Sequence, residues 1–238
     1  MEPRNDLPVI SLFSGAGGLD LGFESAGFRI AVALESDSSC CNTLTVNRPN
    51  LPVINSKIED TSTAAILAVA GLQPLEAALV IGGPPCQSFS LAGLRKGLDD
   101  ERGRLLFEYV RVVREALPIG FVLENVKGLM NWNAGKALQM LIAELSKPIL
   151  YQNTSYVYTV SEPRVLNAVD YGVPQHRERV VLIGNRNNLP YNYPEPNKQG
   201  NATTVWSAIG NLPAPAEPSA TAKRVSGTIS ERRVKHGF

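Results

Sequence analysis

Short apolar segments alternate with stretches of helical period along the first 184 residues of the chain, and this alternation restricts its fold more than any other feature. Strands and helices that follow each other in this order build a parallel sheet covered by helices. The expected strands are Val9–Phe13, Arg29–Leu34, Pro52–Asn55, Ala78–Ile81, Gly120–Leu123, Gln152–Val160 and Arg179–Gly184. The expected helices are Gly18–Ala26, Ser39–Val46, Thr63–Ala70, Arg104–Ala116 and Lys136–Leu145. The sequence therefore predicts an α/β fold.

Length, charge and cysteine content limit the classes of protein to which the chain can belong. The chain has 238 residues, enough for a complete core, and a formal net charge of +1. Any contact with nucleic acid must therefore come from a local basic patch, and a polybasic binder is excluded. Cys40, Cys41 and Cys86 show no CxxC spacing, so we expect neither a metal site nor a disulfide framework. The N-terminal segment resembles neither a secretory signal nor a membrane span, so we expect a cytoplasmic protein.

The chain changes character after Gly184. Residues 185–238 are rich in proline, contain one plausible short helix at Thr204–Ile209, and end in the basic stretch KRVSGTISERRVKHGF. We therefore expect a catalytic domain over residues 1–184 and an irregular extension over residues 185–238, the basic end of which orders only on binding.

A glycine-rich turn follows the first expected strand, in SLFSGAGGLDL. Gly15, Gly17 and Gly18 permit close approach of a ligand to the backbone and to the start of the next helix, although tight packing alone explains many such turns. Glu35 ends the next strand, where a carboxylate accepts hydrogen bonds from ribose hydroxyls. The turn departs from GxGxxG, which favours a nucleoside carrier other than NAD.

Cys86 follows another strand end, in VIGGPPCQSFS. Ligands of α/β sheets bind beyond the carboxyl ends of the strands, so this thiol should face the same crevice as the glycine turn. A lone cysteine is more often a buried structural residue, but the polar neighbours Gln87 and Ser88 favour a nucleophile.

Two further segments add charged groups. Glu124 comes at the end of an apolar strand, in GFVLENV, where a carboxylate needs partners. Arg177 and Arg179 precede the apolar run VVLIG and are two residues apart, which places them on one face of a strand. Either arginine can direct a fork of donors at a carbonyl or a phosphate. A thiol, a carboxyl group and guanidinium donors beside a nucleoside site together suit addition to carbon 6 of a pyrimidine.

These segments resemble the cytosine-5 DNA methyltransferases. SLFSGAGGLDLGFESAGF is similar to motif I of that family, GGPPCQSFS to motif IV, LENVKGL to motif VI and DYGVPQHRERVVLIG to motif VIII, in the family's order. The resemblance spans about Val9 to Leu212. It implies a Rossmann-like, doubly wound sheet that is mostly parallel, with an antiparallel strand near its C-terminal end, and a reaction that transfers methyl from S-adenosylmethionine to carbon 5 of a flipped-out cytosine in double-stranded DNA.

The resemblance also assigns roles to residues. It implies that Cys86 is the nucleophile and that Glu124 engages ring nitrogen 3. It places Arg179 on the base oxygen, with Arg177 in support. The implied cofactor contacts are Phe13, Gly15, Ala16, Gly18, Glu35, Ile58, Pro85 and Leu105. The implied DNA contacts are Ser90 and Arg102.

Two departures from the family pattern stand out. Lys57 replaces the aspartate that usually contacts adenine, for which Asn55, Glu59 or Asp60 are possible substitutes. After Leu212 neither a target-recognition domain nor motifs IX and X are found. The first explanation is a split enzyme of a bacterial restriction-modification system, whose second polypeptide supplies those parts. The others are a truncated product and a variant with minimal recognition.

Three rival functions stay open. A tRNA cytosine-5 methyltransferase shares the motif set, although PPCQSFS is closer to the DNA-acting pattern than to PPCQPFT. A regulatory binding module that has lost catalysis would have no need to keep Cys86, Glu124, Arg177 and Arg179. An NAD-dependent dehydrogenase is disfavoured by the glycine turn and by the lack of a suitably placed histidine.

Overall fold

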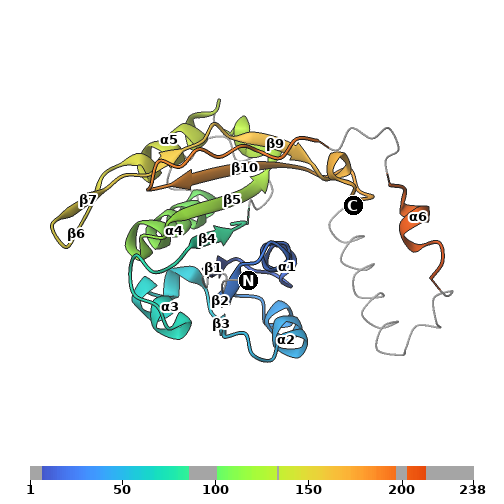
Figure 1. Ribbon diagram of the computed structural model, residues 1–238, viewed down its shortest axis with the longest axis horizontal. Helices are drawn as coiled ribbons and strands as arrows, with labels where there is room; N and C mark the ends of the chain where they lie inside the picture. Colours follow the sequence, from blue (N-terminus) through green and yellow to red (C-terminus); the bar gives the residue numbers. More distant parts are fainter. Residues whose placement is uncertain (1–6, 86–100, 133, 197–202, 213–238) are drawn as a thin grey trace, which may run out of the picture.

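The computed structural model describes residues 7–85, 101–132, 134–196 and 203–212 (Figure 1). Its main sheet has the order β3-β2-β1-β4-β5-β10-β8, with β9 also paired to β10. The first five strands are β1 (Pro8–Leu12), β2 (Arg29–Glu35), β3 (Val53–Asn55), β4 (Leu79–Gly82) and β5 (Gly120–Val126). The later strands are β8 (Thr159–Val160), β9 (Arg164–Asn167) and β10 (Glu178–Asn185).

Strand direction agrees with the expected fold. β1 to β5 pair in parallel, whereas β10 runs antiparallel to β5, to β8 and to β9. The order reverses between β1 and β4, so the chain leaves these neighbouring strands toward opposite sides of the sheet. Such a switch point leaves a crevice at the carboxyl ends of the two strands, where α/β folds bind ligands. The glycine turn follows β1, and the segment that leads to Cys86 follows β4.

Helices cover both faces of the sheet. They are α1 (Gly18–Ser25), α2 (Ser38–Asn47), α3 (Thr63–Ala70), α4 (Glu101–Ala116), α5 (Lys136–Ser146) and α6 (Val205–Ile209), with 3-10 turns at Ile58–Asp60, Lys127–Met130 and Ala168–Tyr171. Alternate side chains of β1 point to opposite faces of the sheet and pack into different cores. Ile10 and Leu12 join the large core that α3, α4 and α5 cover, whereas Val9 joins a smaller cluster with Phe23 of α1.

Most expected strands are shifted or extended by a residue at their ends, and three differences have a physical cause. β1 ends one residue early, because Phe13 adopts a left-handed conformation with φ 54°. β5 continues past Leu123 to Val126, because β10 pairs with it that far, so Glu124 lies inside the strand. The β-rich stretch expected at Gln152–Val160 is divided, and its last part pairs with β10 as β8. That stretch contains a turn at Gln152 and Asn153, both with positive φ, between β6 (Ile149–Tyr151) and β7 (Thr154–Tyr156), and then the separate β8.

The stretch after β10 packs back against the sheet. Tyr193 donates a hydrogen bond from its hydroxyl to the Val181 carbonyl at 2.9 Å, and Tyr191 donates to the Ile183 carbonyl at 3.2 Å. Burial raises the pKa of Tyr193. Further on, α6 begins at a capping box formed by Thr204 and Ser207. Within the part of the chain that the structure describes, no helix is long and apolar enough to span a membrane.

A glycine in β10 is required by its cross-strand neighbour. Gly184 lies opposite Phe121 of β5, and a methyl group added at Gly184 would lie 2.3 Å from Cζ of that fully buried ring. We expect Gly184→Ala to lower the free energy of unfolding by about 1–3 kcal/mol in urea denaturation, because the ring has no room to move away. Gly22→Ala is the control, since a methyl there meets nothing within 4 Å. Equal stability of Gly184→Ala and wild type would contradict this packing.

Candidate active site

The glycine turn after β1 presents two open glycines and one packed glycine. A methyl group added at Gly15 or Gly18 would meet nothing within 4 Å, so both positions border free space. A methyl at Gly17 would instead lie 2.8 Å from Cδ2 of Leu44, which packs α2 against the turn. The left-handed conformation of Phe13 is costly for a side chain of its size, and strain of this kind is concentrated at ligand sites. The side of the turn formed by Gly15 and Gly18 is therefore free of neighbouring atoms in the described part of the chain, whereas the side at Gly17 is packed against α2.

Glu35 is held against this turn by backbone donors. Its Oε2 accepts a hydrogen bond from the Gly15 N–H at 2.8 Å, and its Oε1 accepts from the N–H groups of Ser36 and Asp37, each at 2.8 Å. Because a carboxylate oxygen has two acceptor sites, Oε2 can still accept another hydrogen bond. Glu35 therefore lies against the glycine turn, with its carboxylate oriented by three backbone donors.

The other expected cofactor positions differ in their exposure. Ile58 is buried in the core with an exposed fraction of 2%, and its carbonyl accepts hydrogen bonds from Arg111 Nη2 at 3.0 Å and from the Thr61 N–H at 3.2 Å. Lys57, beside Ile58, is exposed to solvent. Phe13 and Leu105 are half-buried against the large core, Ala16 is exposed in the turn, and Pro85 is exposed after β4.

The segment that leads to Cys86 is anchored by Asn125 of β5. Asn125 has an exposed fraction of 3% and donates a hydrogen bond from Nδ2 to the Pro84 carbonyl at 3.0 Å. A methyl group added at Gly83 would lie 2.9 Å from Oε2 of Glu124, so a larger residue there would have to displace the Glu124 carboxylate. The backbone before Cys86 is therefore pressed against Glu124. Cys86 and Ser90 themselves lie outside the described residues, as does the side chain of Arg102 at the start of α4.

Glu124 is paired with both expected arginines. Arg179 Nε lies 2.9 Å from Glu124 Oε1, and Arg177 Nη2 lies 3.8 Å from the same oxygen. The antiparallel register explains the pairing, because Val181 lies opposite Glu124 and places Arg179 diagonally across from it. Both Glu124 and Arg179 are about one quarter exposed, with side-chain fractions of 27% and 26%. A polar ligand can therefore reach a carboxylate whose charge is already compensated.

Sequence reasoning missed three residues of this region. Asn125 was part of a recognised motif, but nothing in its spacing indicated that its side chain anchors Pro84. Asp20 and Arg48 form an ion pair of 3.3 Å between α1 and the end of α2, directly below the glycine turn. Asp20 is a charged residue that interrupts the apolar face of a helix, which is a weak signal of a buried ion pair. Arg48 gave no signal.

The doubly wound, mostly parallel sheet with an antiparallel strand beside β5 has the Rossmann-like fold of the S-adenosylmethionine-dependent methyltransferases. The chain belongs to the C-5 cytosine-specific DNA methylases, because the model of that family matches residues 7–234.

Similar proteins agree with this membership. The type II methyltransferase M.AquIA of Picosynechococcus is 53% identical over 97% of this chain and 98% of its own length. M.XorII of Xanthomonas oryzae is 44% identical over 86% of this chain, but over only 46% of its own length. A prophage-encoded Escherichia coli protein, crystallised as a candidate DNA modification methyltransferase, aligns with a TM-score of 0.73 at 30% identity, over 89% of this chain and 57% of its own. The chain thus spans about half the length of some relatives and nearly all of another.

Proposed function

We propose that this chain is the catalytic part of a type II DNA methyltransferase that methylates carbon 5 of cytosine through a covalent bond to Cys86. The observation that carries the proposal is the meeting of Glu124 with Arg179 and Arg177 beside the Gly83–Pro84 segment. The carboxyl group of Glu124 and the guanidinium groups of Arg177 and Arg179 thus lie beside the backbone segment that immediately precedes Cys86 in the chain.

The crevice suits S-adenosylmethionine. Glu35 offers an oriented carboxylate to ribose hydroxyls, and the open side of Gly15 and Gly18 leaves room beside the N-terminus of α1. When bound, the cofactor supplies a methyl group on a sulfonium sulfur, which makes that methyl electrophilic. Lys57 occupies the place of the aspartate that usually contacts adenine in this family, and its side chain is exposed. We therefore assign adenine selection to other groups, with Asn55, Glu59 and Asp60 as candidates.

The proposed chemistry uses three side chains. The Cys86 thiolate adds to carbon 6 of the cytosine, and the electrons of the carbon 5–carbon 6 double bond become available at carbon 5. Glu124 stabilises the ring at nitrogen 3, and Arg179 donates to the exocyclic oxygen, so that the charge that develops on the ring is compensated. Carbon 5 uses these electrons to bond the methyl group, and the electron pair of the broken sulfur–methyl bond stays on the cofactor sulfur. Carbon 5 then loses its proton to a general base, and the bond from carbon 6 to sulfur breaks to regenerate the Cys86 thiolate. The target cytosine must leave the DNA base stack before this reaction, because its carbon 6 is not accessible within the stack.

Asn125 should affect this chemistry without contacting the base. We expect Asn125→Ala to lower the maximal rate of methyl transfer by about tenfold, because the Pro84 carbonyl loses its donor and the backbone before Cys86 loses its anchor. The dissociation constant for S-adenosylmethionine should stay within about twofold of wild type. Steady-state kinetics and calorimetric titration check the two values. A weakened cofactor complex with an unchanged maximal rate would contradict this role.

We further propose that a second polypeptide supplies the target-recognition domain and motifs IX and X. M.AquIA supports this, because a protein named a type II methyltransferase matches this chain over 98% of its own length, whereas M.XorII extends to about twice the matched part. Double-stranded DNA would then be gripped largely by that second polypeptide, with Ser90 and Arg102 as the contacts from this chain. The net charge of +1 agrees with such a division.

Co-expression tests the two-chain arrangement. The reading frame beside this one should encode motifs IX and X, and its product should co-purify with this chain and raise methylation of DNA well above that of either polypeptide alone. A neighbouring frame without those motifs, or full activity of this chain by itself, would contradict the arrangement.

A further inference from the structure

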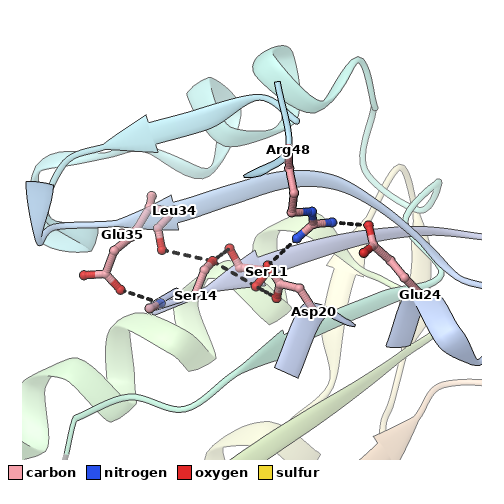
Figure 2. A network of polar contacts seen from close by, with 8 residues as sticks. Ser11, Ser14, Asp20, Glu24, Leu34, Glu35 and Arg48 are labelled. Carbon is pink, nitrogen blue, oxygen red and sulfur yellow. Dashed lines mark hydrogen bonds and ion pairs between the residues drawn. The ribbon is translucent and has the colours of Figure 1, made fainter. Parts of the chain in front are cut away.

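Asp20 is a fully buried carboxylate that the proposed chemistry does not use. It lies in the first turn of α1 with an exposed fraction of 0%, below the glycine turn (Figure 2). Burial raises the pKa of Asp20, while the Ser11 hydrogen bond and the Arg48 charge oppose that rise. Buried ion pairs are seldom the most stabilising solution for a site, because well-packed apolar side chains do as well or better. The position of Asp20 therefore points to a role other than stability.

Each carboxylate oxygen of Asp20 has its own partner. The Ser11 hydroxyl donates to Oδ1 at 2.5 Å, and Arg48 Nη1 lies 3.3 Å from Oδ2. Because the single hydroxyl hydrogen of Ser11 goes to Asp20, Ser11 can only accept in the 2.9 Å contact between the two serine hydroxyls. The Ser14 hydroxyl also lies within donating distance of the Ser11 carbonyl at 3.1 Å and of the Leu34 carbonyl at 3.5 Å. Figure 2 shows the resulting chain of contacts from Asp20 through Ser11 to Ser14, directly before Gly15.

Arg48 extends this chain of contacts to a second helix. It is the C-cap residue of α2, and its guanidinium also pairs with Glu24 near the end of α1. A methyl group added at Gly17 would lie 3.5 Å from Arg48 Nη1 and 3.8 Å from Asp20 Oδ2, so the ion pair lies against the turn itself. On the other side of the turn, Gly15 donates to Glu35. The turn is thus fixed at Ser14, Gly15 and Gly17.

We propose that Asp20 and Arg48 are positioning residues that hold the glycine turn in the shape that receives S-adenosylmethionine. We call Ser11, Asp20 and Arg48 the turn brace. The proposal rests on the proposed function, since it concerns affinity for the same cofactor. Without the brace, the turn has to be ordered by the ligand, and affinity falls by the free energy of that ordering.

The test is calorimetric titration of the full chain, together with the proposed second polypeptide, with S-adenosylmethionine. Asp20→Ala and Arg48→Ala should each raise the dissociation constant about tenfold or more, because each removes a charge-assisted contact. Arg48→Lys keeps the charge and should recover part of the loss. Because the two residues act as a unit, the double variant Asp20→Ala/Arg48→Ala should lose less than the sum of the two single losses, in logarithms of the dissociation constant.

A core variant separates positioning from general destabilisation. Leu141→Ala removes a buried side chain from α5 on the other face of the sheet, and should lower thermal stability while leaving cofactor affinity within about twofold. Affinity within twofold of wild type in folded Asp20→Ala and Arg48→Ala, or an equal loss in Leu141→Ala, would overturn the turn brace. A wild-type protein that binds no S-adenosylmethionine would instead overturn the proposed function, and the brace with it.

Discussion

Replacement of Cys86 by alanine is expected to abolish methyl transfer, with a loss on the order of 10⁴-fold or more, because the proposed mechanism forms its bond to carbon 6 through this thiolate. The direct measurement is covalent trapping. The protein, the proposed second polypeptide and S-adenosylmethionine are incubated with duplex DNA that contains 5-fluorocytosine in the recognised site. Fluorine at carbon 5 cannot leave as a proton does, so the wild-type protein should remain bound to the DNA under denaturing conditions.

Cys41→Ala is the matched control for that experiment. Cys41 is buried in α2, its pKa is raised by burial, and its thiol donates to the Glu35 carbonyl at 3.4 Å, so it has no nucleophilic role. The Cys41 variant should therefore form the covalent complex, and the Cys86 variant should not. A complex that persists in Cys86→Ala would contradict the covalent mechanism.

Glu124→Gln is expected to have the second largest effect, a reduction of methyl transfer of about 10²–10⁴-fold. Glutamine keeps the size of the side chain but removes the carboxyl group that serves as the acid at ring nitrogen 3 in the proposed chemistry, and the charge that pairs with Arg179. The loss should appear in the maximal rate, whereas the dissociation constant for S-adenosylmethionine should stay within about twofold, because Glu35 and the glycine turn are unchanged. Single-turnover kinetics and calorimetric titration check the two quantities.

Glu178 offers a control in the adjoining strand. It forms an exposed ion pair of 2.9 Å with Lys127, and exposed pairs of this kind contribute little. Glu178→Gln should therefore retain activity within about twofold. Comparable losses in the two variants would mean that the charge of this strand region matters and that Glu124 has no special role at the base.

The sequence predicted the sheet because buried parallel strands leave a strong apolar signal. It did not indicate the division of Gln152–Val160, where the turn depends on two non-glycine residues in the left-handed region, for which Gln152 gives no local cue. Phe13 shows the same limit, since its conformation is imposed by the turn around it and not by its own preference.

The site was predicted unevenly for a similar reason. Glu124 and Arg179 belong to motifs, and the antiparallel pairing of β5 and β10 brings them together. The turn brace depends on an ion pair between residues 28 positions apart, on two helices whose relative placement no spacing rule provides. Residues that act through other residues therefore emerge only from the three-dimensional structure.

The measurement that most directly tests the account is mass spectrometry of the nucleosides released from the methylated product. The protein and the proposed second polypeptide are supplied with S-adenosylmethionine labelled in the methyl group, and with duplex DNA or tRNA in parallel reactions. The account predicts label in 5-methyldeoxycytidine from the DNA, lost in Cys86→Ala. Label on an exocyclic nitrogen of cytosine or adenine, or label confined to 5-methylcytidine from the tRNA, would contradict it.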